Sequence, residues 1–380
     1  AMSQKSSEMK AQGIDVINMS VGEPDFMTPD HVKEAGKKAI DDNFSKYSPV
    51  PGYPVLREAI VKKLKQENHL DYAVSEIVVG TGGKQGVCNA ILALVNPGDE
   101  VIIPAPYWVS YPQMVKLAGG VPVIVSAGIE QDFKITAEQL EHAITPKTKM
   151  IILCSPSNPT GSVYSAEELE SLAKVVLAHD DLFVLSDEIY EHINYIGGHC
   201  SIASCQGMKD RTILCNGVSK AYAMTGWRLG WIAAPEWIAK GINKLQGQYT
   251  SGTCSVSQMA AVAAYEADQA CVADYREAFR RRRDLIVELA KDIPGLEVNV
   301  PQGAFYLFPK CSSYFGKTDG KHVIRSSSDL AMYILEEGGV ATVGGDAFGA
   351  PECFRMSYAT SDDNIKEALH RIKEVLSKLK

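Results

Sequence analysis

The sequence predicts an α/β fold with a mainly parallel central sheet and a second, smaller α+β region. Short apolar runs rich in Val and Ile recur between residues 76 and 233, helical patterns lie between several of them, and the pattern changes after a long helical segment at 274–292. Strands that are apolar on both faces and alternate with helices are typical of a parallel sheet that helices cover on both sides.

Seven apolar runs are the expected strands of the central sheet: 76–79, 100–103, 122–126, 150–154, 183–186, 212–215 and 230–233. The helices expected between them are 84–95, 108–117, 166–178 and 237–248. In the C-terminal part, runs 303–308 and 354–357 are predicted strands beside predicted helices 328–337 and 361–379. The long segment 274–292 is a candidate hinge between the two regions.

Composition limits the class of partner. The net charge of −8 argues against nucleic acid or an anionic membrane as the main partner. The one basic cluster, 280–283, lies in the helical segment 274–292, where Glu277 is placed to pair with Arg281 one turn on, so we interpret it as a solvated helix face rather than a binding patch. Nine cysteines without a C-x-x-C pair indicate neither zinc nor disulfides, and no apolar run has the length of a membrane span. We expect a cytoplasmic protein.

Lys220 is the first candidate for chemistry. A lysine is usually a solvated surface residue. Lys220, however, follows the predicted strand 212–215 and has small and apolar neighbours, and a desolvated amine is a usable nucleophile. Arg228, in an otherwise apolar segment, needs an anion, and a phosphate matches its planar guanidinium.

Asp187 stands at the carboxyl end of the predicted strand 183–186, where ligands bind in open α/β sheets. Such a carboxylate binds a metal, acts as a base or holds a protonated ring nitrogen, although no second group of ligands supports a metal. An aspartate that only caps a helix is the structural alternative.

Two turns also end predicted strands. Residues 80–85 link a strand to a helix, so their backbone N–H groups and the helix dipole form either an anion site or a simple tight turn. Residues 155–161 contain seven turn-forming residues and place Asn158 at the edge of the sheet, unless they are a plain loop.

Together these segments resemble a known family. The order and neighbours of the motifs are similar to those of class I aminotransferases of fold type I, close to the bacterial aspartate aminotransferase branch. The motifs that carry the resemblance are SVGEPDF (20–26), KYSPVPGYPVLREAI (46–60), GGKQ (82–85), PYWVSYPQMV (106–115), SPSNPTG (155–161), SDEIYEH (186–192), NGVSKAYAMTGWRLGW (216–231), GAFY (303–306) and FRMSYA (354–359).

The resemblance implies pyridoxal 5′-phosphate as cofactor and a role for each motif. Lys220 would carry the cofactor as a Schiff base and later move a proton. Asp187 would pair with the ring nitrogen, Tyr190 and Asn158 would hydrogen-bond the phenolic oxygen, and Trp108 would stack on the ring. The implied phosphate ligands are Gly82, Gly83 and Arg228, and Lys84 and Ser219 also belong to the implied cofactor site. Family members usually carry a hydroxyl three residues before the lysine, where this chain has Gly217, and Ser219 or Thr250 would have to replace it.

The resemblance also implies the substrate contacts and the assembly. Arg355 would bind the substrate α-carboxylate, helped by Asn158 and the Gly22 backbone, and Lys84 with Trp108 would complete the substrate site. Tyr47 resembles the tyrosine that a partner subunit contributes to the phosphate, so we expect a homodimer with shared sites. The large domain would span 30–285, with a seven-stranded sheet, and the small domain would combine 1–29 with 286–380.

The predicted reaction is transfer of the amino group of aspartate or glutamate to 2-oxoglutarate or oxaloacetate by a ping-pong mechanism. The resemblance implies that Lys84, the lysine of the GGKQ motif, would hold the distal carboxylate in place of an arginine, which the segment 246–250 does not offer. The alternatives are an aminotransferase that prefers aromatic amino acids or prephenate, a lyase on the same fold, and a ligand-sensing regulator. We expect no DNA-binding domain of such a regulator in this chain.

Overall fold

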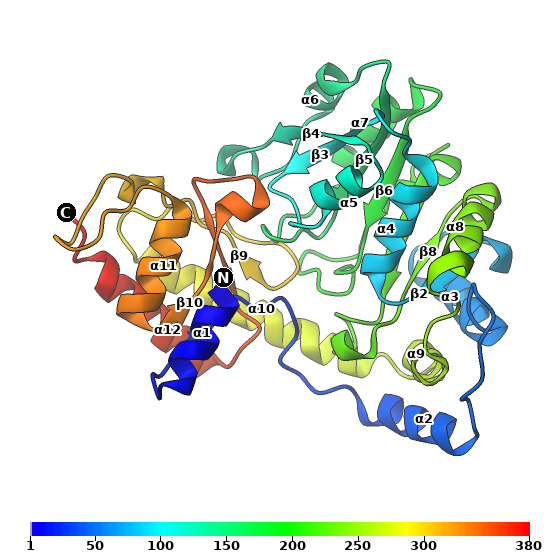
Figure 1. The fold of residues 1–380 in the computed structure, drawn as a ribbon, viewed down its shortest axis with the longest axis horizontal. Coiled ribbons are helices and arrows are strands. Elements are labelled where there is room, and N and C mark those ends of the chain that lie inside the picture. The colour runs from blue at the N-terminus through cyan, green and yellow to red at the C-terminus, as the bar shows by residue number, and fades with distance from the viewer. Residues whose placement is uncertain (1) are drawn as a thin grey trace.

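The computed structural model describes residues 2–380 and contains a central seven-stranded sheet with helices on both faces (Figure 1). The strand order is β2-β8-β7-β6-β5-β3-β4. Neighbours from β4 to β7 run parallel, whereas β8 is antiparallel to both β7 and β2. The strands are β2 (Ile77–Gly80), β3 (Glu100–Ala105), β4 (Val121–Ser126), β5 (Thr148–Cys154), β6 (Phe183–Asp187), β7 (Thr212–Gly217) and β8 (Gly230–Ala233).

The helices cover both faces of this sheet because apolar side chains point out of it on each side. One face packs against α4 (Gly83–Leu94), α5 (Tyr111–Leu117) and α8 (Glu236–Tyr249). The opposite face packs against α6 (Ala137–Ala143) and α7 (Ala166–Leu177) in one part, and against α3 (Pro54–Glu67) and α9 (Ser255–Glu266) in the other. Helix α2 (Asp30–Asp41) contacts α9 on the outside.

A second apolar core lies in the C-terminal part. Its sheets are β11-β12-β9, formed by Val343–Gly344, Phe354–Ser357 and Tyr306–Leu307, and the parallel pair β1-β10, formed by Ile17–Asn18 and Val340–Ala341. Helices α11 (Ser327–Gly338) and α12 (Asp362–Leu376) pack on this core, and α1 (Met2–Ala11) contacts β10 in a smaller apolar cluster beside it. The pair β1-β10 brings the N-terminal segment beside the C-terminal one.

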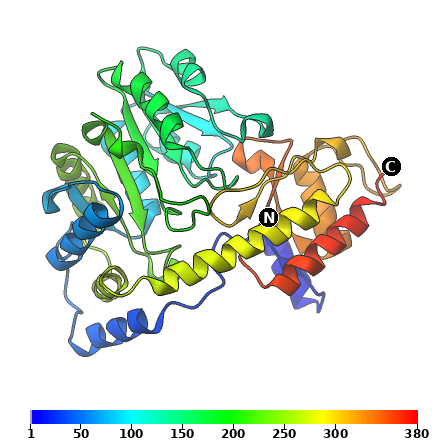
Figure 2. The same cartoon turned by 180° about the vertical axis from the view of Figure 1, so that it is seen from behind.

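Helix α10 (Ala270–Lys291) connects the two regions and crosses the molecule as a long rod, yellow in Figure 2. The predicted domain boundary at residue 285 falls inside this helix, and it stays a prediction. No helix over residues 2–380 is long and apolar enough to cross a membrane.

The predicted fold is confirmed, and the strand and helix predictions differ from the structure in detail. The predicted strand 303–308 is reduced to Tyr306–Leu307, because Ala304 takes a left-handed conformation with φ 55° that interrupts an extended chain. The predicted pair of Glu277 and Arg281 is wrong: Glu277 pairs with Arg280, and Arg281 pairs with Asp362. The basic cluster is also not wholly solvated, because Arg282 is buried and forms two hydrogen bonds with Asp25.

Candidate active site

A cavity of about 550 Å³ lies at the carboxyl ends of β5, β6 and β7. Parallel strands end together at this edge, so residues that are distant in sequence meet there. The cavity is lined by most of the predicted site residues: Gly22, Gly83, Lys84, Trp108, Asn158, Asp187, Tyr190, Ser219, Lys220, Arg228 and Arg355. Gly82 lies directly beside Gly83, whereas Tyr47 is not part of this lining.

Lys220 lies in the turn after β7, and its side chain is largely enclosed. Its amine donates a hydrogen bond to the carbonyl oxygen of Gly22, which belongs to the segment that follows β1. Burial lowers the pKa of Lys220 from about 10.5 to about 8, against the opposing effect of Glu23. A much larger fraction of the amine is therefore neutral near pH 8 than for a solvated lysine, as a nucleophilic amine requires.

Asp187 is the last residue of β6 and is buried at the inner end of the cavity. Its Oδ2 accepts a hydrogen bond of 2.6 Å from the hydroxyl of Tyr111, at the start of α5. Burial raises the pKa of this carboxyl, while the Tyr111 hydroxyl opposes the shift. A protonated ring nitrogen placed beside Asp187 would favour its charged form.

Arg355 on β12 reaches the cavity from the C-terminal region. Its guanidinium donates to Asn158 Oδ1 at 2.8 Å and to the Ser20 carbonyl at 2.7 Å, and its central carbon lies 4.6 Å from the centre of the Tyr306 ring and 4.9 Å from that of Phe348. The Arg355 Nε is buried without a hydrogen-bond partner in the structure. Tyr190 lies next to this group and shares a hydrogen bond of 2.7 Å with the Tyr306 hydroxyl.

The turn before α4 and Arg228 form one end of the cavity. Helix α4 begins after Gly82, which has φ 80° and offers no side-chain cap, so its first N–H groups are free of a capping side chain. A Cβ on Gly82 would lie 2.6 Å from Arg228 Nη2, so the glycine allows the guanidinium to approach the helix start. Arg228 itself has φ 53° and is held by the Thr225 carbonyl at 2.8 Å. Together these groups have the chemistry that binds an anion.

Close packing of the backbone explains why position 217 is a glycine. A Cβ there would lie 2.8 Å from the Gly230 Cα and 2.8 Å from the Leu229 carbonyl oxygen, both on the backbone, so β7 and β8 leave no room for a side chain. Of the two proposed replacements for the missing hydroxyl, Ser219 lines the cavity. Thr250 does not, and its hydroxyl accepts a hydrogen bond from Gln85 instead.

Lys84 lies at the mouth of the cavity, with its amine 4.9 Å from the centre of the Trp108 ring. Within residues 2–380, none of the ion pairs involves Lys84, Arg228 or Arg355. Tyr47 is 99% exposed on the outer surface, as a residue that acts on another subunit would be. These positions are compatible with the predicted roles.

Several lining residues have no role predicted from the sequence. Tyr111 and Tyr306 contact Asp187 and Tyr190, and Glu23 accepts a hydrogen bond of 2.9 Å from Thr225 at the rim. Tyr111 stands three residues after Trp108 and Tyr306 ends the GAFY motif, so both lie inside motifs that carry the family resemblance. Their hydroxyls are indistinguishable from those of ordinary core tyrosines until the fold brings them to the cavity.

The comparisons with known proteins agree with this geometry. The family model described as aminotransferase class I and II matches residues 14–372. An aspartate/prephenate aminotransferase of Cereibacter sphaeroides is 49% identical, covering 98% of this chain and 94% of the relative. A bifunctional aspartate aminotransferase and glutamate/aspartate-prephenate aminotransferase of Petunia hybrida is 48% identical, covering 100% of this chain and 80% of the relative.

Solved structures show the same fold. The aspartate aminotransferase of Rhizobium meliloti superposes with a TM-score of 0.97 at 44% identity, covering 100% of this chain and 96% of that one. The Thermus thermophilus enzyme with maleate has a TM-score of 0.92 at 41% identity, covering 98% and 95%. The chain therefore belongs to the class I and II aminotransferase family. It is an aminotransferase of fold type I, and enzymes of this family use pyridoxal phosphate.

The residues present fit that cofactor. The anion site at the start of α4 matches a phosphate, the buried carboxylate of Asp187 matches a ring nitrogen, and the Lys220 amine of lowered pKa matches an aldehyde. Each of these three groups lines the cavity or borders it, so one molecule can meet them all.

Proposed function

We propose that this aminotransferase moves the amino group of aspartate or glutamate to 2-oxoglutarate or oxaloacetate. The observation that carries the proposal is the presence of Lys84, Arg228 and Arg355 in one cavity without an acidic partner among residues 2–380. One cation suits the cofactor phosphate, and two remain for the two carboxylates of a dicarboxylic substrate. Maleate, with which the Thermus thermophilus enzyme was solved, is also a dicarboxylate.

In this proposal each side chain has one task. Arg355, which is in contact with the rings of Tyr306 and Phe348, binds the α-carboxylate through its paired N–H groups. Lys84 binds the distal carboxylate as a point charge at the cavity mouth. Asn158 orients Arg355, since its amide oxygen accepts one of the guanidinium hydrogen bonds.

The proton transfer belongs to Lys220. When bound, pyridoxal phosphate supplies an electron sink that stabilises negative charge at the substrate Cα. With the cofactor bound, the Lys220 Nζ would take the proton from the substrate Cα and carry it through a 1,3-shift to the cofactor side of the reacting nitrogen, which its pKa of about 8 permits near neutral pH. Asp187 keeps the ring nitrogen protonated, and Tyr190 donates a hydrogen bond from a phenol whose pKa burial raises, so that it stays neutral. Release of one 2-oxo acid before the other binds makes the mechanism ping-pong.

A second substrate preference has independent support. The relatives named above carry prephenate in their names beside aspartate. The cavity also has an apolar lining from Val21, Val109, Val343 and Phe348, which suits a ring. We therefore propose prephenate or an aromatic acid as a further acceptor.

The rest of the biological setting is also proposed. The exposed Tyr47 supports a homodimer with shared sites, and the two apolar cores support the division into residues 30–285 and the remainder. A cytoplasmic location is the expectation from composition alone.

A panel of amino donors and acceptors tests the substrate proposal. Aspartate, glutamate, phenylalanine and alanine are offered with 2-oxoglutarate, oxaloacetate or prephenate, and formation of each 2-oxo acid is followed. The proposal expects aspartate and glutamate to be the best donors by kcat/KM. An enzyme that ignores both dicarboxylic donors contradicts the substrate assignment and leaves the aminotransferase class intact.

A further inference from the structure

A buried network of charged and amide side chains lies behind the cavity, outside its lining. Lys63 on α3 and Glu191 in the loop after β6 form an ion pair with side chains only 2% and 4% exposed. Asn68 joins both: its Oδ1 accepts from Lys63 at 2.7 Å and its Nδ2 donates to Glu191 Oε2 at 2.9 Å. The sequence does not predict two buried charges of this kind, because charged side chains are rarely fully buried.

The network reaches both segments that carry the proposed catalytic groups. Glu191 directly follows Tyr190 and comes four residues after Asp187. Its Oε1 also accepts 2.8 Å from the amide of Asn216 on β7, and Asn216 Oδ1 in turn accepts 2.7 Å from the Gly217 N–H. Gly217 is the last residue of β7, three residues before Lys220. One carboxylate is thus tied to the Asp187–Tyr190 loop through its own backbone and to the Lys220 turn through Asn216.

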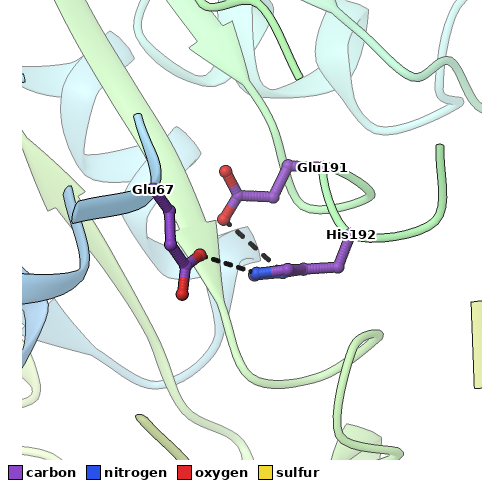
Figure 3. A group of neighbouring side chains, drawn as sticks. All are labelled: Glu67, Glu191 and His192. Atoms are coloured by element: carbon purple, nitrogen blue, oxygen red, sulfur yellow. Dashed lines mark hydrogen bonds and ion pairs between the residues drawn. The ribbon is translucent and has the colours of Figure 1, made fainter. Parts of the chain in front are cut away.

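Two groups around Glu191 have the composition of a metal site. Glu67, Glu191 and His192 form one (Figure 3), Glu188, Glu191 and His199 form the other, and the ligand atoms of each group lie within 4.8 Å of one another. Glu191 is common to both. The Lys63 ammonium already contacts Glu191 and lies 3.5 Å from Glu67, so a metal ion there would meet a buried positive charge at short range. The Lys63 ammonium therefore occupies the position in which a metal ion would contact these carboxylates.

We propose that Lys63, Glu191 and Asn216 are positioning residues that fix the Asp187–Tyr190 loop relative to Lys220. A buried ion pair adds little net stability over apolar side chains of the same size, but its hydrogen bonds are directional. Here the carboxylate accepts from Lys63, Asn68 and Asn216, which come from α3, the segment after it and β7. Lys63 in turn is anchored because α3 packs against the sheet through Leu56, Ile60 and Leu64. The inference rests on the roles proposed above for Lys220 and Asp187.

The test compares two matched double variants of the holoenzyme. Lys63→Met with Glu191→Gln removes the network's charges at nearly constant volume. Lys134→Met with Glu168→Gln does the same to a partly buried pair of 2.8 Å that lies outside the cavity lining. Measured quantities are the thermal midpoint, kcat and KM for the best donor, and the pH midpoint of the bound cofactor's visible absorbance.

For the network variant we expect kcat to fall at least about tenfold with KM changed less than about twofold, because a misplaced acid and base affect the transition state more than binding. The absorbance midpoint should shift by at least about half a pH unit, since the groups around the ring move. The control variant should keep its kcat and its absorbance midpoint, whatever its thermal midpoint.

Equal behaviour of the two variants contradicts the positioning role and leaves a structural ion pair. If the network variant does not fold, the same kcat, KM and absorbance measurements on Asn216→Ala test the positioning role. This variant keeps the ion pair and removes the bridge to Gly217. Failure of the proposed function is separate: it appears as cofactor attached to a lysine other than Lys220 in the unmodified enzyme.

Discussion

At the level of single residues, the burial of Asp187 points to a positively charged group on the cofactor. The buried carboxylate has one hydroxyl partner, so a nearby positive charge would strongly stabilise its charged form. The protonated ring nitrogen of the cofactor would supply that charge. Asp187→Asn keeps the shape and the hydrogen bond from Tyr111 but loses the charge. We expect kcat to fall on the order of 10²-fold, from the loss of a charge-assisted interaction in the transition state.

Steady-state kinetics of Asp187→Asn with cofactor at saturation checks this expectation. Tyr111→Phe is the companion variant and should lose less, because the carboxylate remains. Turnover of Asp187→Asn near that of the unmodified enzyme would mean that the aspartate only caps the following loop.

Lys84 decides the substrate class. Its amine is exposed at the cavity mouth and lies over Trp108, without an acidic partner in the described part of the chain. Lys84→Ala should raise KM for aspartate about tenfold or more, equivalent to about 1.4 kcal/mol, and should change KM for an uncharged amino acid much less. The comparison of the two donors removes any general effect on the site.

Lys240→Ala is the matched control, since Lys240 is an exposed lysine that forms a surface ion pair with Glu236. It should change neither KM. If Lys84→Ala affects both donors equally, the distal carboxylate is bound elsewhere.

At the level of elements, two glycine variants test whether the turn before α4 binds the cofactor phosphate. Gly82→Ala places a side chain at a strained φ of 80° and a methyl group 2.6 Å from the Arg228 guanidinium. Gly98→Ala also places a side chain at a positive φ, 88°, but nothing lies within 4 Å of the new atom. We expect Gly82→Ala to weaken cofactor binding to the apoenzyme by about tenfold or more, and Gly98→Ala to leave it unchanged.

Equilibrium titration of each apoenzyme with pyridoxal phosphate measures the difference. Similar affinities for the two variants would show that the start of α4 and Arg228 do not bind the phosphate. Both variants should lose some thermal stability, because each places a side chain at a positive φ.

The sheet could be predicted from sequence because its strands are continuous apolar runs. Each of the seven predicted runs overlaps a strand, and the candidate site followed from residues at the ends of those runs. The prediction failed where a single backbone conformation decides, as at Ala304, which interrupts the strand expected at 303–308. Local pattern gives no sign of such a left-handed residue when it is not glycine.

Pairings between distant charges cannot be predicted from local sequence. The charged neighbours of Arg282 indicate a solvated side chain, yet Arg282 is buried against Asp25. Lys63 and Glu191 carry no signal because neither stands in an apolar run that demands a partner. Such pairs depend on which elements the topology brings together, and α3 meets the loop after β6 only in the folded chain.

At the level of the whole molecule, the proposed dimer places Tyr47 in the partner's site. Tyr47→Ala and Lys220→Ala homodimers should each be poorly active. After the two are mixed and allowed to exchange subunits, each hybrid dimer has one complete site. Random exchange should therefore restore about a quarter of the activity of the unmodified enzyme.

Activity of the mixture that equals the average of the two homodimers would contradict shared sites. So would a fully active monomer in sedimentation at the assay concentration.

Borohydride reduction of the holoenzyme followed by peptide mass spectrometry is the most direct test that the cavity is built around a cofactor on Lys220. The label should lie on Lys220 alone, and Lys220→Ala should take none. In the apoenzyme, the initial rate of attachment of pyridoxal phosphate should rise with pH and level off above about 8, because the lowered pKa makes the amine neutral there. A label on another lysine, or a rate that keeps rising towards pH 10.5, the ordinary pKa of lysine, would contradict the assignment.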